Sequence, residues 1–204
     1  MDASQVYGLN NDASKSLRLG TLGLLRTSKG VISTRDYLPV TFGTNKSDPC
    51  SLTNSSIKCF VAGDTRASEN LGLSSMHTLF LREHNRIAQQ LALISPQLND
   101  NELFYQARSI LVGVYQHIIY NEFVPATIGT YSIPDLAPKQ YNTYFNGYDP
   151  TVNPSLANEF ATATLRFGHS AVNRLMNRFD SKNNNLNSPT NVIDQIFVSD
   201  QAYE

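Results

Sequence analysis

One continuous stretch, AGDTRASENLGLSSMHTLFLREHNR at residues 62–86, decides how the rest of the chain is interpreted. Its second half predicts a helix, because Ser74 or Ser75 is a good N-cap and Pro96 forbids continuation. Between these limits, apolar and polar residues follow helical spacing: Met76, Leu79, Phe80, Glu83, Ile87 and Leu91. Its first half places Arg66 three residues before Glu69. On sequence alone, such a pair is most simply a solvated or helix-surface ion pair worth under about 1 kcal/mol.

Two further helices are expected downstream. One begins near Asp100 and ends by Pro125, and its inward positions are Leu103, Ala107, Ile110, Leu111, Val114 and Ile118. The other opens at Asn153-Pro154, because proline at the first helical position loses nothing by lacking an N–H, and runs to about Met176. Residues 1–60 are expected to form loops, turns and brief strands over a core supplied elsewhere. Residues 183–187 are expected to form a loop, and residues 192–198 are too few to classify.

Composition limits the classes of protein that fit. The chain has 204 residues, of which 41% are hydrophobic, and this is enough for one domain or part of one. Sixteen basic and seventeen acidic residues give a net charge of -1, so no basic field exists to attract nucleic acid. No apolar run approaches the roughly 18 residues of a membrane span, and the N-terminus lacks the features of a signal peptide.

Cys50 and Cys59 are the only two cysteines, and they lie in one polar loop with sequons at Asn45 and Asn54. Oxidised, secretory surroundings with a Cys50–Cys59 disulfide explain all four residues. Two unrelated free thiols and chance sequons are the alternative. We expect the disulfide, which contributes roughly 2 to 3 kcal/mol in the chain-entropy model. A secreted protein without a signal peptide is expected to be a fragment.

Four histidines raise the question of a metal site. His77 and His84 share one helical face, but a rise of about 1.5 Å per residue separates them by roughly 10 Å, so one ion cannot bind both. They are expected to bond to nearby backbone or carboxylates, and His117 is expected to be structural. His169 follows Gly168, and glycine inside a helix costs about 1 kcal/mol. Taken without further context, His169 is most simply a core histidine.

Three blocks of sequence together resemble the animal haem peroxidases, the superfamily of peroxidasin and myeloperoxidase. Residues 62–86 resemble one wall of the haem pocket, LRFGHS at residues 165–170 resembles the helix of the proximal haem ligand, and DASQVYG at residues 2–8 resembles the end of a calcium loop. The blocks occur in the family's order. The resemblance implies a mainly α-helical domain with long loops and little β-structure. It also implies that residues 1–204 are the central part of one such domain, incomplete at both ends.

The resemblance assigns roles to four residues around haem b. His169 is the expected proximal iron ligand, and Arg66 is expected to point into the distal cavity, where a permanent cation hydrogen-bonds peroxide. Glu69 is the expected ester link to a haem methyl group, and Arg166 is a weaker candidate for a haem propionate. Asn70 stands where myeloperoxidase has a Met linked to a haem vinyl, a bond that Asn cannot make. The chain is therefore expected to be closer to peroxidasin.

The calcium site and the acid-base machinery are expected to be incomplete. Asp2 and Ser4 offer a carboxylate and a hydroxyl for Ca²⁺. The family's other calcium ligands, its distal His and the Asn that pairs with the proximal His fall outside this chain. The 204 residues alone are therefore expected to be poorly soluble and inactive.

The implied function is a secreted peroxidase that reduces hydrogen peroxide and oxidises a halide, thiocyanate or phenolic donor. Its expected partners are peroxide, a small electron donor and the extracellular matrix, with no nucleic acid. One alternative is a secreted peroxidase-like binding or structural module without turnover. A second is a helical glycoprotein with no cofactor.

Overall fold

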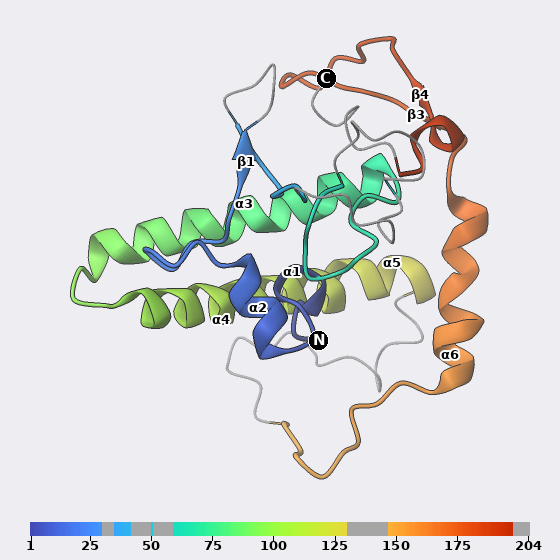
Figure 1. Cartoon of the computed structure of the whole chain (residues 1–204). Coiled ribbons are helices and arrows are strands. Elements are labelled where there is room, and N and C mark those ends of the chain that lie inside the picture. Colours follow the sequence, from blue (N-terminus) through green and yellow to red (C-terminus); the bar gives the residue numbers. More distant parts are fainter. Residues whose placement is uncertain (30–34, 42–49, 51–58, 130–146, 198–204) are drawn as a thin grey trace.

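The computed structural model describes residues 1–29, 35–41, 50, 59–129 and 147–197. Its centre is a pair of long helices, α3 (Leu71–Ile94) and α4 (Asp100–Ile118), which run antiparallel and pack against each other (Figure 1). Two short N-terminal helices, α1 (Ser4–Tyr7) and α2 (Asn11–Leu17), lie beside them. The mainly helical prediction is therefore confirmed.

Strands are few and short in the described residues. β1 (Ser28–Lys29) pairs antiparallel with β2 (Asp36–Tyr37), and β3 (Leu175–Met176) pairs antiparallel with β4 (Thr190–Asn191). The Asn-rich residues 183–187 lie in the loop between β3 and β4, as expected, and η5 (Val192–Gln195) is a 3₁₀ turn after β4. No described helix is long and apolar enough to cross a membrane.

Helix α3 begins earlier than its sequence suggests. The N-cap is Asn70, whose Oδ1 accepts the backbone N–H of Leu73 at 3.0 Å, and not Ser74 or Ser75. Ser74 is buried instead, and its hydroxyl donates to the Ala67 carbonyl oxygen at 2.8 Å. The helix ends at Ile94, two residues before Pro96, as predicted.

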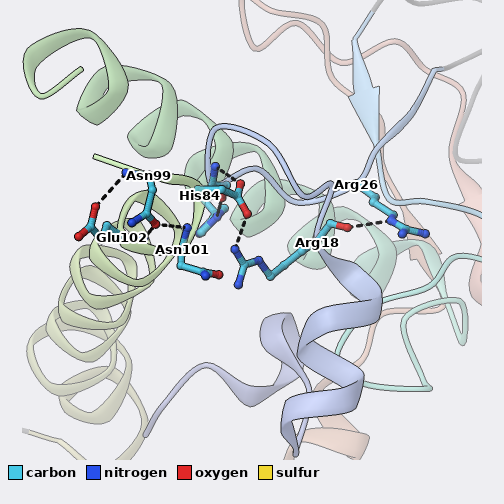
Figure 2. Close-up of polar contacts among 8 residues, drawn as sticks. Arg18, Arg26, His84, Asn99, Asn101 and Glu102 are labelled. Atoms are coloured by element: carbon cyan, nitrogen blue, oxygen red, sulfur yellow. Dashed lines mark hydrogen bonds and ion pairs between the residues drawn. The ribbon is translucent and has the colours of Figure 1, made fainter. Parts of the chain in front are cut away.

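Helix α4 begins at Asp100, as predicted, behind a capping box. The Asn99 side chain accepts from the N–H groups of Asn101 and Glu102, and the Glu102 carboxylate accepts from the Asn99 N–H (Figure 2). Together these bonds satisfy donors that a helix N-terminus leaves unpaired.

Helix α4 ends at Ile118, before Pro125 as predicted, but the helical path continues past the proline, which was not predicted. A π-helical turn, η2 (Ile119–Phe123), follows α4 and leads into α5 (Val124–Ile128). The Val124 N–H donates to the Ile119 carbonyl oxygen five residues back, which is the π-helical pattern. Pro125 then stands in the first turn of α5, directly after the π-helical turn.

The third helix is also shorter than predicted. Residues 153–157 are not helical, and α6 (Asn158–Thr162) is followed by a 3₁₀ helix, η4 (Thr164–Ala171), while Met176 lies in β3. The apolar side chains of Phe160, Leu165 and Phe167 are exposed, because no other described segment covers them. Figure 1 shows this segment on the outside of the α3–α4 pair.

The core draws on more of the chain than expected. Residues 1–60 supply a large share of the buried apolar side chains, namely Ala3, Val6, Tyr7, Leu17, Leu25, Leu38 and Phe60. The expectation that another segment supplies this core is therefore wrong. On α4, Leu103, Ala107 and Leu111 are buried as predicted, whereas Ile110 and Val114 are exposed.

The buried face of α3 is largely polar. Its buried residues are Ser74, His77, Thr78, Leu81, His84, Ile87 and Ala88, while the apolar Met76 and Leu79 are exposed. Hydrophobic spacing alone therefore selects the wrong face in the first turns of α3.

His84 lies at the centre of this polar face and is fully buried. Its Nε2 lies 2.9 Å from the Gly23 carbonyl oxygen, and its Nδ1 lies 2.9 Å from the Tyr7 hydroxyl. Because a carbonyl oxygen only accepts, Nε2 carries the proton and Nδ1 accepts from the tyrosine. The pKa of His84 is lowered from 6.5 to about 4, chiefly by burial and also by the nearby Arg18 charge, against the opposing effect of the Gly23 hydrogen bond. The imidazole is therefore neutral near pH 7.

Asp100 joins the N-terminal segment that contains Gly23 to α4 through hydrogen bonds. Its carboxylate accepts from the Gly23 N–H at 2.7 Å and from Arg18 Nη2 at 2.5 Å (Figure 2). The Arg18 guanidinium also lies 4.3 Å from the centroid of the buried Phe104 ring. The segment from Arg18 to Gly23 is thus held on both long helices at once.

Gly63 brings the segment before α3 into direct contact with α1. A Cβ placed on Gly63 would lie 2.3 Å from the Ser4 carbonyl oxygen and 2.3 Å from the Gly8 nitrogen. The next residue, Asp64, donates its N–H to the Gln5 carbonyl oxygen at 3.1 Å. Only glycine fits this approach, so two sequence blocks more than fifty residues apart form one packed unit.

We expect the free energy of unfolding to fall as the pH decreases from 6.5 to about 4. The folded state holds His84 neutral across this range, so unfolding takes up a proton and is favoured by acid. The shift corresponds to a loss of up to about 3 kcal/mol. Urea unfolding at several pH values checks this. In His84→Gln the amide can keep both hydrogen bonds but cannot titrate, so the slope against pH should shrink. Equal slopes in the two proteins would contradict the assignment.

Gly63→Ala should destabilise the protein by at least about 2 kcal/mol, because the added methyl group meets backbone atoms that cannot move aside. Gly113→Ala is the matched control. Gly113 lies within α4 with nothing within 4 Å of its added Cβ, so alanine there should stabilise the helix by roughly 0.5 to 1 kcal/mol. Thermal unfolding of the two variants should shift in opposite directions. A neutral Gly63→Ala variant would reject the close packing.

Candidate functional site

Arg66 lies in the turn before α3 and is paired with Asp64. Its Nε and Nη2 donate to the two carboxylate oxygens at 3.0 and 2.7 Å, and its backbone N–H donates to Asp64 Oδ1 at 2.8 Å. The hydrogen bond from Arg66 lowers the pKa of Asp64, and the same bond raises the pKa of Arg66. The ion-pair partner is therefore Asp64 and not Glu69. The Arg66 side chain remains 68% exposed, so it is free to reach a ligand.

Glu69 and Asn70 follow at the start of α3. Glu69 is half-buried; its N–H donates to the Arg66 carbonyl oxygen at 2.9 Å, and its own carbonyl oxygen accepts from the Phe197 N–H at 3.2 Å. Asn70 is the helix cap described above. The capping role went unrecognised in the sequence because the two serines at 74 and 75 offered a competing signal.

His169 and Arg166 lie in η4, on the outside of the described structure. His169 is exposed, and a Cβ placed on the neighbouring Gly168 would meet nothing within 4 Å. Arg166 is exposed and donates from Nε to the Thr162 carbonyl oxygen at 3.1 Å. Among the described residues, no hydrogen bond or ion pair joins this pair to Arg66 or Glu69. The candidate site therefore consists of two halves on different elements.

The residues present fit a haem group by their chemistry. An exposed imidazole stands beside a glycine with open space, and the exposed Leu165 and Phe167 provide apolar surface for a flat macrocycle. Arg166 adds a cation for an acidic substituent. The imidazole could therefore serve as an iron ligand, and the Arg166 cation could pair with a propionate.

Asp2 and Ser4, the candidate calcium ligands, lie together at the start of α1. The Ser4 N–H donates to Asp2 Oδ1 at 3.1 Å. Burial raises the pKa of Asp2, but hydrogen bonds from the Ser4 backbone and hydroxyl outweigh it, so the net pKa is lowered. Within the described ranges, no three His, Cys, Asp or Glu side chains form a cluster able to hold a metal ion.

Cys50 and Cys59 form a disulfide, as predicted, with their Cα atoms 5.5 Å apart, and both residues are buried. The sequons at Asn45 and Asn54 lie outside the described residues.

The remaining histidines bond to their surroundings. His77 Nδ1 lies 2.8 Å from the Leu73 carbonyl oxygen, and the exposed His117 accepts at Nδ1 from the Asn121 side chain at 3.1 Å. His84 bonds to the Gly23 backbone, as described. These contacts match the structural roles expected for all three residues.

Comparison with known proteins identifies the relatives of this chain. A family model described as animal haem peroxidase matches residues 1–204. The chain is 40% identical over 184 residues to the human peroxidasin homolog, covering 88% of this chain and 12% of that protein. It is 40% identical over 189 residues to human eosinophil peroxidase, covering 89% of this chain and 25% of that protein. The chain thus spans a quarter or less of these curated relatives.

A solved structure shares the fold. Peroxidase A from Dictyostelium discoideum superimposes with a TM-score of 0.78 at 30% sequence identity, covering 96% of this chain and 36% of that one. A family match over the whole chain and a shared fold lead to the same conclusion: this chain belongs to the animal haem peroxidase family.

Proposed function

We propose that this chain is the central part of a haem peroxidase domain that reduces hydrogen peroxide and oxidises a halide, thiocyanate or phenolic donor. The observation that carries the proposal is the exposed imidazole of His169 beside the open Gly168, on a segment whose apolar side chains are uncovered. Similarity to peroxidasin and eosinophil peroxidase supports it.

Three residues hold haem b in this proposal. His169 would bind the haem iron, Glu69 would provide the carboxylate for the ester link, and Arg166 would pair with a propionate. The bound haem supplies the redox chemistry of iron. Asn70 forms no link, because its side chain is the cap of α3 and contains no sulfur.

Arg66 acts on peroxide in this proposal. Two of its donor nitrogens, Nε and Nη2, are directed to Asp64, so the opposite edge, which includes Nη1, faces away from the carboxylate. That edge can donate hydrogen bonds to bound peroxide and stabilise negative charge as the O–O bond breaks. The ion pair keeps the guanidinium in one orientation for this task.

The proposed setting is extracellular and peroxidasin-like. The Cys50–Cys59 disulfide supports an oxidising compartment, because such bonds persist there. Glycosylation at Asn45 and Asn54, Ca²⁺ bound by Asp2 and Ser4, and contact with the extracellular matrix complete the proposal.

His169→Ala in the complete domain should abolish haem incorporation or strongly alter the Soret band, because the variant lacks the iron ligand. His117→Ala is the control, since that histidine is also exposed but lies on α4. Absorption spectra of both purified variants check this. A normal Soret band in His169→Ala would remove the residue from its role. A domain that binds haem normally but never turns over peroxide would favour the binding-module alternative.

Arg66→Ala should keep haem but slow the consumption of hydrogen peroxide by about 10²-fold or more, as loss of other charge-stabilising donors does. Arg86→Ala is the matched control, because Arg86 is exposed and makes the same two-bond contact with Glu83. Stopped-flow mixing with peroxide measures the rate. Equal rates in the two variants would indicate that Arg66 only forms a surface ion pair and does not act on peroxide.

A further inference from the structure

Two adjoining clefts open along α3. The larger, of about 540 Å³, lies between α3 and the β3–β4 segment, and the smaller, of about 370 Å³, continues along α3 toward Gln89. Arg35 and Arg82 line both clefts. Ser75, Thr78 and Arg82 follow one another at intervals of three and four residues, so this wall is one face of α3.

The lining of the larger cleft is strongly cationic. Its described lining residues include Arg35, Arg82 and Arg178 and no carboxylate, although the whole chain has a net charge of -1. Among the described residues, no acidic side chain forms an ion pair with Arg82 or Arg178. The guanidinium groups of Arg82 and Arg178, which have no acidic partner among the described residues, raise the local concentration of anions.

The neighbouring acids are engaged elsewhere. Asp36 pairs with Lys29 at 2.5 Å, and Asp180 accepts from the backbone N–H groups of Lys182 and Asn184 within its own loop. Neither carboxylate lines the larger cleft, and Asp36 lines the smaller one.

Arg82 is held in position for a ligand. Its Nε donates to the Asp36 backbone carbonyl oxygen at 2.5 Å, and its guanidinium lies 5.0 Å from the centroid of the Tyr37 ring. A carbonyl oxygen orients the guanidinium without neutralising it. The Nη edge therefore remains as a planar pair of donors, which matches the geometry of phosphate and sulfate oxygens.

The facing wall adds a second cation and apolar surface. Arg178 follows β3, and the nearby lining is formed by Met176, Phe179 and Leu186. The hydroxyls of Ser75 and Thr78 supply further donors on the α3 side. The larger cleft thus combines oxyanion donors with apolar walls, in a volume typical of small-molecule sites.

We propose that this cleft binds a small organic oxyanion, a phosphate or sulfate monoester with an apolar body. Arg82 and Arg178 bind the ester oxygens from opposite walls, and Phe179 and Leu186 contact the apolar body. No histidine is among the described residues that line the cleft, so the proposed site does not include the residue assigned to haem iron.

The test is calorimetric titration of the full-length protein with phenyl phosphate at low salt. Phenyl phosphate should bind at least about 10-fold more tightly than inorganic phosphate, because the ring buries apolar surface. Benzyl alcohol, which has the ring without the charge, should show no saturable binding. Higher ionic strength should weaken the binding of phenyl phosphate. Phenyl sulfate is titrated in parallel and shows which ester is preferred.

Four variants locate the binding. Arg82→Gln and Arg178→Gln should each lower the affinity for phenyl phosphate at least about 10-fold, as expected for loss of a charged hydrogen-bond donor. Arg178→Lys keeps the charge but loses the planar pair of guanidinium donors. Its affinity for phenyl phosphate should lie between that of Arg178→Gln and that of the parent protein. Arg26→Gln removes a guanidinium outside both clefts and should bind as the parent does.

Three results would overturn the proposal: parental affinity in both glutamine variants, equal binding of benzyl alcohol, or no measurable binding of either ester. Near-ultraviolet circular dichroism of each variant confirms that the fold is retained. Because the readout uses neither haem nor peroxide, failure of the proposed peroxidase function would leave this test unaffected.

Discussion

The buried imidazole of His84 is the constraint on which the arrangement of the N-terminal segment depends. It occupies a position where a hydrophobic side chain would ordinarily pack, and both of its ring nitrogens bond to the first 25 residues, at Tyr7 and at the Gly23 carbonyl. A buried polar group without partners is costly, so α3 and the N-terminal segment must meet in this register. Asp100 extends the constraint to α4, because it bonds to the N–H of the same glycine.

This packing reaches the functional residues through α1. Gly63 fits against the backbone of Ser4 and Gly8, and Asp64 bonds to Gln5 before it pairs with Arg66. A continuous set of contacts therefore leads from the candidate calcium ligands to the proposed peroxide-binding guanidinium. The two sequence blocks have separate chemistry but share one structural unit, because backbone contacts this close leave little freedom to shift one without the other.

The second half of the proposed haem site differs from the first in its packing. The turn that carries Arg66 is anchored to α1 and α3, whereas η4, with His169, presents exposed apolar side chains. Haem bound in the proposed way covers part of that surface, and burial of apolar area favours its binding. In the cationic cleft along α3, Arg82 forms part of the wall, and its orientation depends on the Asp36 backbone and the Tyr37 ring.

The sequence by itself determined the helical class, the limits at Pro96 and Asp100, the disulfide and the residues that carry the family resemblance, because these depend on local chemistry and on short motifs. Tertiary structure decided which face of α3 is buried, since hydrogen bonds with the distant residues Tyr7 and Gly23 allow His84 to point inward, while Met76 and Leu79 stay outside. It also decided that Asn70 caps α3, that Asp64 pairs with Arg66, and that a π-helical turn carries the chain past Pro125. In each case the local sequence also allows another cap, another ion-pair partner or another helix end of similar energy. Only contacts within the folded chain make one of them the more stable.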